Sequence, residues 1–230
     1  MKLALYSNQT IAETDSITSK LLARIGRTSP RIGYISSAPD PQRTFYDSIS
    51  AYYRHFGGSI GSYNDLEDGY NPTTLGDAFD SDALHLTGGN TFRFLNWIQK
   101  RSMKERLIEY AKGGGTLIGV SAGSIIMTPT IESSALCGDT NEIGLSDMTG
   151  LDIFPFQVIP HAHQIEGLDT KAREIVRKKL VPAYCIKDDQ ALFYDGTKVE
   201  IIGGASFYPI CSEQNRDNHP PQPFRASAQR

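Results

Sequence analysis

One short motif of the chain is typical of a nucleophilic serine: Gly119-Val120-Ser121-Ala122-Gly123. It follows the apolar run 116–120 and precedes a short segment with helical spacing, so Ser121 lies where a strand turns sharply into a helix. Small residues at 119 and 123 allow that turn to close, and the amino end of a helix favours developing negative charge. The pattern alone can arise by chance in a chain with 21 glycines. Its place between a strand and a helix favours Ser121 as a catalytic nucleophile.

A glycine pair earlier in the chain is suited to stabilising the negative charge that such a serine creates. Thr87-Gly88-Gly89-Asn90-Thr91 follows an apolar strand and opens a helix, and its glycines let backbone amides approach a substrate closely. An acyl-transfer enzyme needs amide donors aimed at the oxyanion. We expect the amides of Gly89 and Ala122 to be these donors. The alternative is an ordinary strand-to-helix turn with a helix cap.

A serine hydroxyl needs a base, and the chain has five histidines. Three of them are expected to be structural or solvated: His55 in a helix, His85 in a strand and His219 in the tail. His161 and His163 remain, because they follow the apolar run 154–159. Alternation would place both on one face if that strand continued, which would also suit a metal pair. No Cys or further His lies at matching spacing, so we expect no metal.

The base needs an acceptor that orients it, and Asp188-Asp189 follows the expected strand 183–187. Paired acids after a strand are also common in solvated turns, and spacing alone does not choose between these readings. The order along the chain is Ser121, His161, Asp188. An α/β-hydrolase has the order serine, acid, histidine, so this chain is not expected to be one.

Length, charge and cysteine content narrow the class of protein. A chain of 230 residues with 39% hydrophobic content can bury one substantial core. A net charge of -3 gives no broad field for nucleic acid or membrane lipid, and no apolar run approaches a membrane span. Three cysteines without CxxC spacing are not a disulfide framework. We expect a cytoplasmic protein with reduced cysteines, and the sequence leaves its oligomeric state open.

The elements that position these residues form an alternating pattern. Short apolar, β-branched runs are expected to be strands at 2–6, 31–36, 59–63, 83–87 and 116–120. Helical spacing fills 14–25, 41–56 and 91–110, where Ser102 suggests the start of a second helix. This alternation predicts an α/β fold with a mostly parallel, doubly wound sheet and helices on both faces.

Three further segments complete the prediction. Asp195-Gly196 between two apolar runs predicts an antiparallel hairpin near the carboxyl end. The polar stretch 128–149 is longer than an ordinary connection and is a candidate active-site loop. Residues 212–230, rich in Gln, Asn, Pro and Arg, are expected to be a disordered tail. The fold is therefore expected to be a single domain over 1–211.

The chain resembles the peptidase E family, the aspartyl dipeptidases, in several motifs that occur in the same order. These motifs are Ser7-Asn8 after the opening strand, Gly88-Gly89-Asn90-Thr91-Phe92, residues 119–123, Phe154-Pro155-Phe156-Gln157 and Pro160-His161. The likeness continues to about Leu192 and covers most of the expected folded part. It implies a fold resembling the glutamine amidotransferase domain, which is flavodoxin-like.

The resemblance also implies roles for single residues. The Pro-His pair of the family falls on Pro160-His161, which makes His161 the base, and the oxyanion amides fall on Gly89 and Ala122. The resemblance assigns substrate binding to Asn90, and it nominates Arg173 to bind the aspartate carboxylate of the substrate, a task suited to a planar bidentate donor.

The chain departs from the family pattern at two places. The family acid is typically Glu, whereas this chain offers Asp188 or Asp189, and an Asp needs the backbone nearer to the imidazole. The spacing from His161 to Arg173 is also shorter than in the typical family member.

The resulting expectation is a serine peptidase that hydrolyses short peptides with an amino-terminal aspartate through an acyl-enzyme on Ser121, without a cofactor. Two alternatives stay open: a related serine hydrolase of different specificity, such as a cyanophycinase-like enzyme or an esterase, and a non-catalytic binding domain on the same scaffold. A glutamine amidotransferase would carry Cys at the elbow instead of Ser121. The role of His163 and a lid function for 128–149 are also left open.

Overall fold

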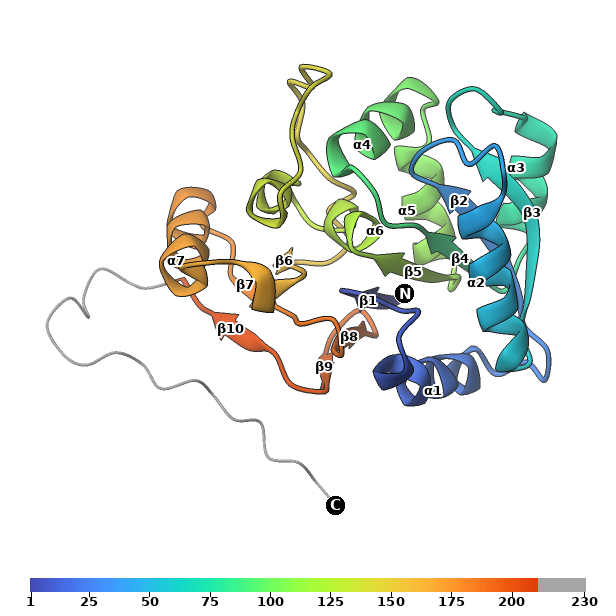
Figure 1. The fold of residues 1–230 in the computed structure, drawn as a ribbon, viewed down its shortest axis with the longest axis horizontal. Helices are drawn as coiled ribbons and strands as arrows, with labels where there is room; N and C mark the ends of the chain where they lie inside the picture. The colour runs from blue at the N-terminus through green and yellow to red at the C-terminus, as the bar shows by residue number, and fades with distance from the viewer. Residues whose placement is uncertain (211–230) are drawn as a thin grey trace, which may run out of the picture.

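The structure, a computed structural model, describes residues 1–210 and is built around a seven-stranded sheet (Figure 1). The strand order is β3-β2-β4-β5-β1-β8-β9. β1 to β5 are parallel, and β8 and β9 add an antiparallel edge. The strands are β1 Lys2–Tyr6, β2 Arg31–Ser36, β3 Ser59–Asp65, β4 Ala83–Leu86, β5 Thr116–Val120, β8 Ala191–Tyr194 and β9 Val199–Ile202. The predicted mostly parallel sheet and its terminal antiparallel hairpin are confirmed.

Helices cover both faces of this sheet because successive strand residues point to opposite sides. Leu3 and Leu5 of β1 belong to a core beneath α3, α4, α5 and α6, whereas Ala4 and Tyr6 belong to a core beneath α1 and α2. The helices are α1 Asp15–Ile25, α2 Thr44–His55, α3 Pro72–Phe79, α4 Thr91–Lys100, α5 Lys104–Lys112 and α6 Ala122–Ile126. The predicted doubly wound arrangement is therefore confirmed.

A second, three-stranded sheet lies beside the main one and was not expected from the sequence (Figure 1). Its strands are β6 Gln157–Ile159, β7 Ala183–Cys185 and β10 Ser206–Tyr208, and α7 Leu168–Lys179 packs against it. β6 is shorter than the expected strand 154–159, because Pro155 and Pro160 have no amide to donate to a ladder.

Local signals set the ends of two helices. The helical region 91–110 is two helices, α4 and α5, with Ser102 at φ 52° between them, which confirms the predicted break. α3 was not expected, although Asn71 accepts hydrogen bonds from the amides of Thr73 and Thr74 and Pro72 occupies the first helical position.

The segment 128–149 is more ordered than a plain connection. It contains a short 3-10 helix, Glu132–Cys137, and Thr130 pairs with Thr149 in an isolated antiparallel bridge. Asp139 accepts hydrogen bonds from the amide and the hydroxyl of Thr91, at 2.8 and 2.6 Å, so the segment is tied to the start of α4.

The structure does not test two of the expectations, the disordered tail and the single domain. The predicted tail 212–230, with Cys211 before it, lies outside the described residues. The single domain over 1–211 stays a prediction. Within 1–210, no helix is long and apolar enough to cross a membrane.

Candidate active site

β5 leads directly into a strained turn at Ser121, which has φ 50° and ψ -108°. Such a conformation is sparsely populated for a residue with a side chain. The turn closes only because its flanks are glycines. A Cβ on Gly119 would lie 2.5 Å from a backbone atom of Gly123, and a Cβ on Gly123 would lie 2.1 Å from the carbonyl oxygen of Leu86. The turn therefore has the tight geometry that the G-x-S-x-G pattern predicts.

Ser121, His161 and Asp188 form a hydrogen-bonded chain. The Oγ of Ser121 is 3.0 Å from Nε2 of His161, and Nδ1 of His161 is 2.6 Å from Oδ1 of Asp188. A carboxylate only accepts hydrogen bonds, so Nδ1 carries the proton and Nε2 is left to accept from the serine hydroxyl. Asp188 rather than Asp189 is thus the acid that contacts the histidine. The imidazole and the carboxylate are both partly buried.

His161 reaches this position through a turn and not along a strand. β6 ends at Ile159, His161 adopts φ 54°, and a 3-10 helix follows over Ala162–Gln164. The strand does not continue to His163, so the alternation that would have placed His161 and His163 on one face does not apply. Nε2 of His163 lies 3.8 Å from the second oxygen of Asp188. Within residues 1–210, no group of three or more His, Cys, Asp or Glu side chains is placed to hold a metal ion.

Ser7, at the end of β1, is a member of the network that the sequence analysis did not assign. Its buried hydroxyl donates to Oδ1 of Asp188 at 2.7 Å and accepts the backbone amide of His161 at 2.8 Å. One side chain thus holds both the acid and the backbone of the base. The available signal was its place at the carboxyl end of a parallel strand, where functional residues of α/β sheets gather.

The loop after β4 places a glycine amide beside Ser121. A Cβ on Gly88 would lie only 3.6 Å from the Cβ of Ser121, and the hydroxyl of Ser37 donates to the carbonyl oxygen of Gly88. The carbonyl and the next amide of a trans peptide point in opposite directions, so the Gly89 amide points away from Ser37. Gly89 has φ 133°, and a Cβ there would lie 2.2 Å from the Ser37 hydroxyl. This position requires glycine.

Asn90 has structural partners on both sides of its amide group. Its Oδ1 accepts the amide of Arg93 at 2.9 Å and caps α4, and its Nδ2 donates to the carbonyl of Thr140 at 3.0 Å. Asn90 directly follows the glycine pair and therefore lies where the loop, α4 and the segment 128–149 meet.

Arg173 lies on α7, outside the hydrogen-bonded chain of Ser121, His161 and Asp188. Its guanidinium forms two hydrogen bonds with the carboxylate of Asp169, at 2.9 and 3.0 Å, and lies 5.4 Å from the ring centre of Tyr208. These hydrogen bonds hold the pKa of Asp169 below its usual range. The guanidinium already binds a carboxylate in the fork geometry expected for the substrate.

Three buried groups, His85, Cys137 and Cys185, are unsuited to act as base or nucleophile. Burial lowers the pKa of His85 to about 3, so this histidine is neutral at ordinary pH. Burial also raises the pKa of Cys137 and of Cys185 to about 12, which keeps both thiols protonated.

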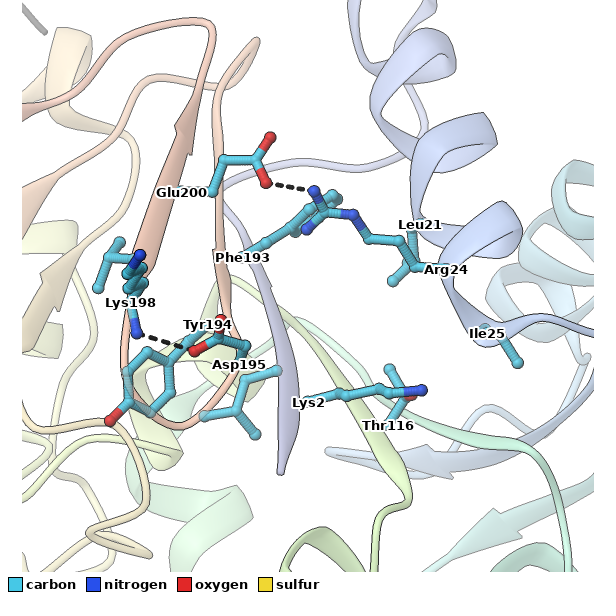
Figure 2. Close-up of a pocket in the computed structure, with 12 residues that line it drawn as sticks. Lys2, Leu21, Arg24, Ile25, Thr116, Phe193, Tyr194, Asp195, Lys198 and Glu200 are labelled. Atoms are coloured by element: carbon cyan, nitrogen blue, oxygen red, sulfur yellow. Dashed lines mark hydrogen bonds and ion pairs between the residues drawn. The ribbon is translucent and has the colours of Figure 1, made fainter.

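A separate cavity of about 490 Å³ lies at the opposite end of the parallel strands (Figure 2). Lys2 and Thr116, the first residues of β1 and β5, line it, whereas Ser121 follows the other end of β5. Arg24 and Glu200 form an ion pair at its wall, and Phe193 lies beneath the Arg24 guanidinium. This cavity is not part of the serine site.

A serine, an imidazole and a carboxylate in series, beside glycine amides at the carboxyl ends of a mostly parallel sheet, define a site of the serine-hydrolase class. Residues 3–202 match peptidase family S51, and the chain belongs to this family. The likeness inferred from the motifs is confirmed at this level.

Two relatives that match part of the chain are both Peptidase E proteins. The chain is 26% identical over 133 residues to Peptidase E of Streptomyces coelicolor, covering 54% of this chain and 53% of that protein. It is 29% identical over 143 residues to Peptidase E of Shewanella sp. (strain ANA-3), covering 59% of each. The matches thus span little more than half the length of these relatives.

Two solved structures share the fold. A candidate peptidase E protein from Listeria monocytogenes EGD-e has a TM-score of 0.69 at 20% identity, covering 87% of this chain and 97% of that one. A peptidase from an acI-B1 actinobacterium has a TM-score of 0.65 at 15% identity, covering 93% and 92%.

Proposed function

We propose that this protein is a serine peptidase that hydrolyses short peptides with an amino-terminal aspartate through an acyl-enzyme on Ser121. The proposal rests on the position of His161. Its Nε2 lies 3.0 Å from Ser121 Oγ, and its Nδ1 lies 2.6 Å from Asp188 Oδ1. This geometry gives the serine a base and gives the base an orienting acid.

The first half of the reaction forms the acyl-enzyme. Nε2 of His161 takes the hydroxyl proton as Oγ of Ser121 attacks the peptide carbonyl, and Asp188 stabilises the resulting imidazolium. The same proton then passes from Nε2 to the leaving amine as the C–N bond breaks. Water, activated by His161, attacks the ester in the second half and releases the amino-terminal residue. No cofactor takes part in these steps.

The negative charge on the carbonyl oxygen is assigned to two backbone amides. Ala122 is the first residue of α6, where amides point out of the helix start, and Gly89 follows Gly88, whose backbone lies beside Ser121. Preorganised donors of this kind account for about a hundredfold or more in rate each.

We assign the selection of aspartate to Arg173. We assign a further substrate contact to Asn90, which caps α4. Support comes from the family resemblance and from the fork geometry that Arg173 already shows with Asp169. A substrate carboxylate would have to replace Asp169 on the guanidinium. Because Asp169 already binds the Arg173 guanidinium, a second candidate function is a related hydrolase of different specificity.

The proposal is tested in two assays. A fluorophosphonate probe should label Ser121, as located by mass spectrometry of a digest, and His161→Ala should prevent labelling. The absence of labelling on a folded protein would favour a non-catalytic domain on this scaffold.

Substrate selection is tested with Asp-Leu, Ala-Leu and a small ester. Arg173→Ala should raise KM for Asp-Leu and leave any Ala-Leu hydrolysis unchanged. Ester or Ala-Leu hydrolysis exceeding that of Asp-Leu would replace the aspartyl specificity by another. A cytoplasmic location and a small peptide as the partner remain predictions from the sequence.

A further inference from the structure

A second cavity, of about 330 Å³, is lined by Gly89, one of the two proposed oxyanion donors. It occupies the carboxyl ends of β2 and β4, and Gly88, Gly89 and Val120 form the wall nearest Ser121. Phe45 and Ile49 of α2 also line it. His161 and Asp188 contact Ser7 at the end of β1, on the other side of β5, so the cavity and the His161–Asp188 pair flank Ser121 from opposite sides.

The lining of this cavity carries no positive charge. Neither lysine nor arginine lines it among residues 1–210. His85 lies at its base, stacked parallel on Tyr34 and hydrogen-bonded through Nδ1 to Tyr53 at 3.1 Å, and burial keeps its ring neutral. An aspartate side chain would therefore be desolvated there without a cationic partner, which is unfavourable.

The acid and the two serine hydroxyls of the lining already have partners within the protein. The carboxylate of Asp40 accepts the backbone amides of Thr44, Phe45 and Tyr46, at 2.9 to 3.1 Å, and caps α2. The Ser37 hydroxyl donates to Gly88. A ligand in this cavity thus meets mainly apolar and aromatic surface.

Phe45 adds apolar surface at the rim. It is 73% exposed at the start of α2, although it is a large hydrophobic residue. An apolar ligand group in the cavity would gain an aromatic contact there. Specificity pockets for small ligands are usually concave, apolar and about 300 Å³ or larger, and this cavity fits that description.

We propose that this cavity binds the apolar or aromatic side chain of residue X in Asp-X substrates. The inference rests on the proposed function: of the two side chains in such a dipeptide, aspartate is charged and does not suit the cavity, so X is the one that fits. The enzyme then selects apolar X over small or acidic X.

The test compares kcat/KM for Asp-Phe, Asp-Ala and Asp-Glu in three proteins: wild type, Phe45→Lys and Ser48→Lys. Ser48 is exposed on the same helix and does not line the cavity, so its variant adds the same charge elsewhere. Wild type should prefer Asp-Phe over Asp-Ala by about tenfold or more, with Asp-Glu poorest. Phe45→Lys should lower the Asp-Phe to Asp-Glu ratio about fivefold or more, and Ser48→Lys should keep the wild-type ratio.

The other outcomes separate the cavity from the proposed function. Hydrolysis of all three peptides with the same ratio in wild type and Phe45→Lys overturns the cavity assignment and leaves the aspartyl peptidase intact. A fourth peptide, Phe-Ala, tests the opposite assignment. If Phe-Ala is hydrolysed and Asp-Phe is not, the cavity binds the first residue of the peptide, and its assignment to X is overturned. If no Asp-X peptide is hydrolysed, the proposed function fails and the inference fails with it.

Discussion

Replacing Ser7 by alanine tests whether the hydroxyl at the end of β1 positions the acid and the base. The hydroxyl donates to Asp188 Oδ1 at 2.7 Å and accepts the amide of His161 at 2.8 Å. A hydrogen bond to a charged group contributes about 1.5–3 kcal/mol. If that contribution is expressed in the transition state, kcat falls about 10- to 100-fold, because about 1.4 kcal/mol corresponds to a factor of ten. KM should change little, since Ser7 is assigned no substrate contact.

The assay is steady-state hydrolysis of Asp-Leu with Ser7→Ala, Ser7→Thr and Ser134→Ala. Ser7→Thr keeps the hydroxyl and should recover much of kcat. Ser134 is a buried serine whose hydroxyl has no hydrogen-bond partner among the described residues, so Ser134→Ala is a matched control that should keep wild-type kcat. A Ser7→Ala enzyme with wild-type kcat, or one whose loss is matched by unfolding at the assay temperature, would refute the positioning role.

Three other predictions follow from the site and its supports. Gly89→Ala should lower kcat about a hundredfold or more in the same assay, since its Cβ would displace the peptide through contact with the Ser37 hydroxyl; near-normal kcat would exclude Gly89 as an oxyanion donor. Asn90→Ser keeps a residue competent to cap α4, so a raised KM at an unchanged melting temperature would support substrate binding by Asn90, whereas unchanged kinetics would leave it structural. His85 binds a proton in the unfolded chain below about pH 6.5 but in the folded protein only near pH 3, so stability falls as the pH is lowered between these values. From about pH 7.5 to about pH 5 its contribution amounts to about 2 kcal/mol of unfolding free energy. Denaturant titrations should show that His85→Phe loses this part of the pH dependence, and an unchanged slope would contradict the assignment.

The serine elbow was predictable because its signal is local. The tight turn needs glycine at 119 and 123 and a strained backbone at Ser121. This requirement is visible in five consecutive residues. The main sheet was predictable for a similar reason, because buried parallel strands are continuous apolar runs.

The acid and the second sheet required three-dimensional information. Asp188 and Asp189 are adjacent and chemically equal, and the turn after β7 decides which one faces His161. Strands were expected over 154–159 and 183–187, where β6 and β7 lie, but nothing local in the sequence shows that they pair with β10 in a separate sheet. Ser7 lies 154 residues from His161, so nothing local in the sequence connects them.

The two features that we assign to substrate selection differ in how far they could be predicted. Arg173 was nominated from a resemblance, but its pairing with Asp169 one helical turn away is a local contact that the i, i+4 spacing permits. The cavity lined by Gly89 combines residues of β2, α2 and β4, and no single segment of the sequence shows it.

The most direct test that Ser121 is the nucleophile is the hydrolysis of Asp-Leu and Ala-Leu by wild type and by Ser121→Ala. The melting temperature of both proteins is measured in parallel. Wild type should cleave Asp-Leu in preference to Ala-Leu, and Ser121→Ala, although folded, should cleave neither. Undiminished cleavage by folded Ser121→Ala would contradict the claim that Ser121 is the nucleophile.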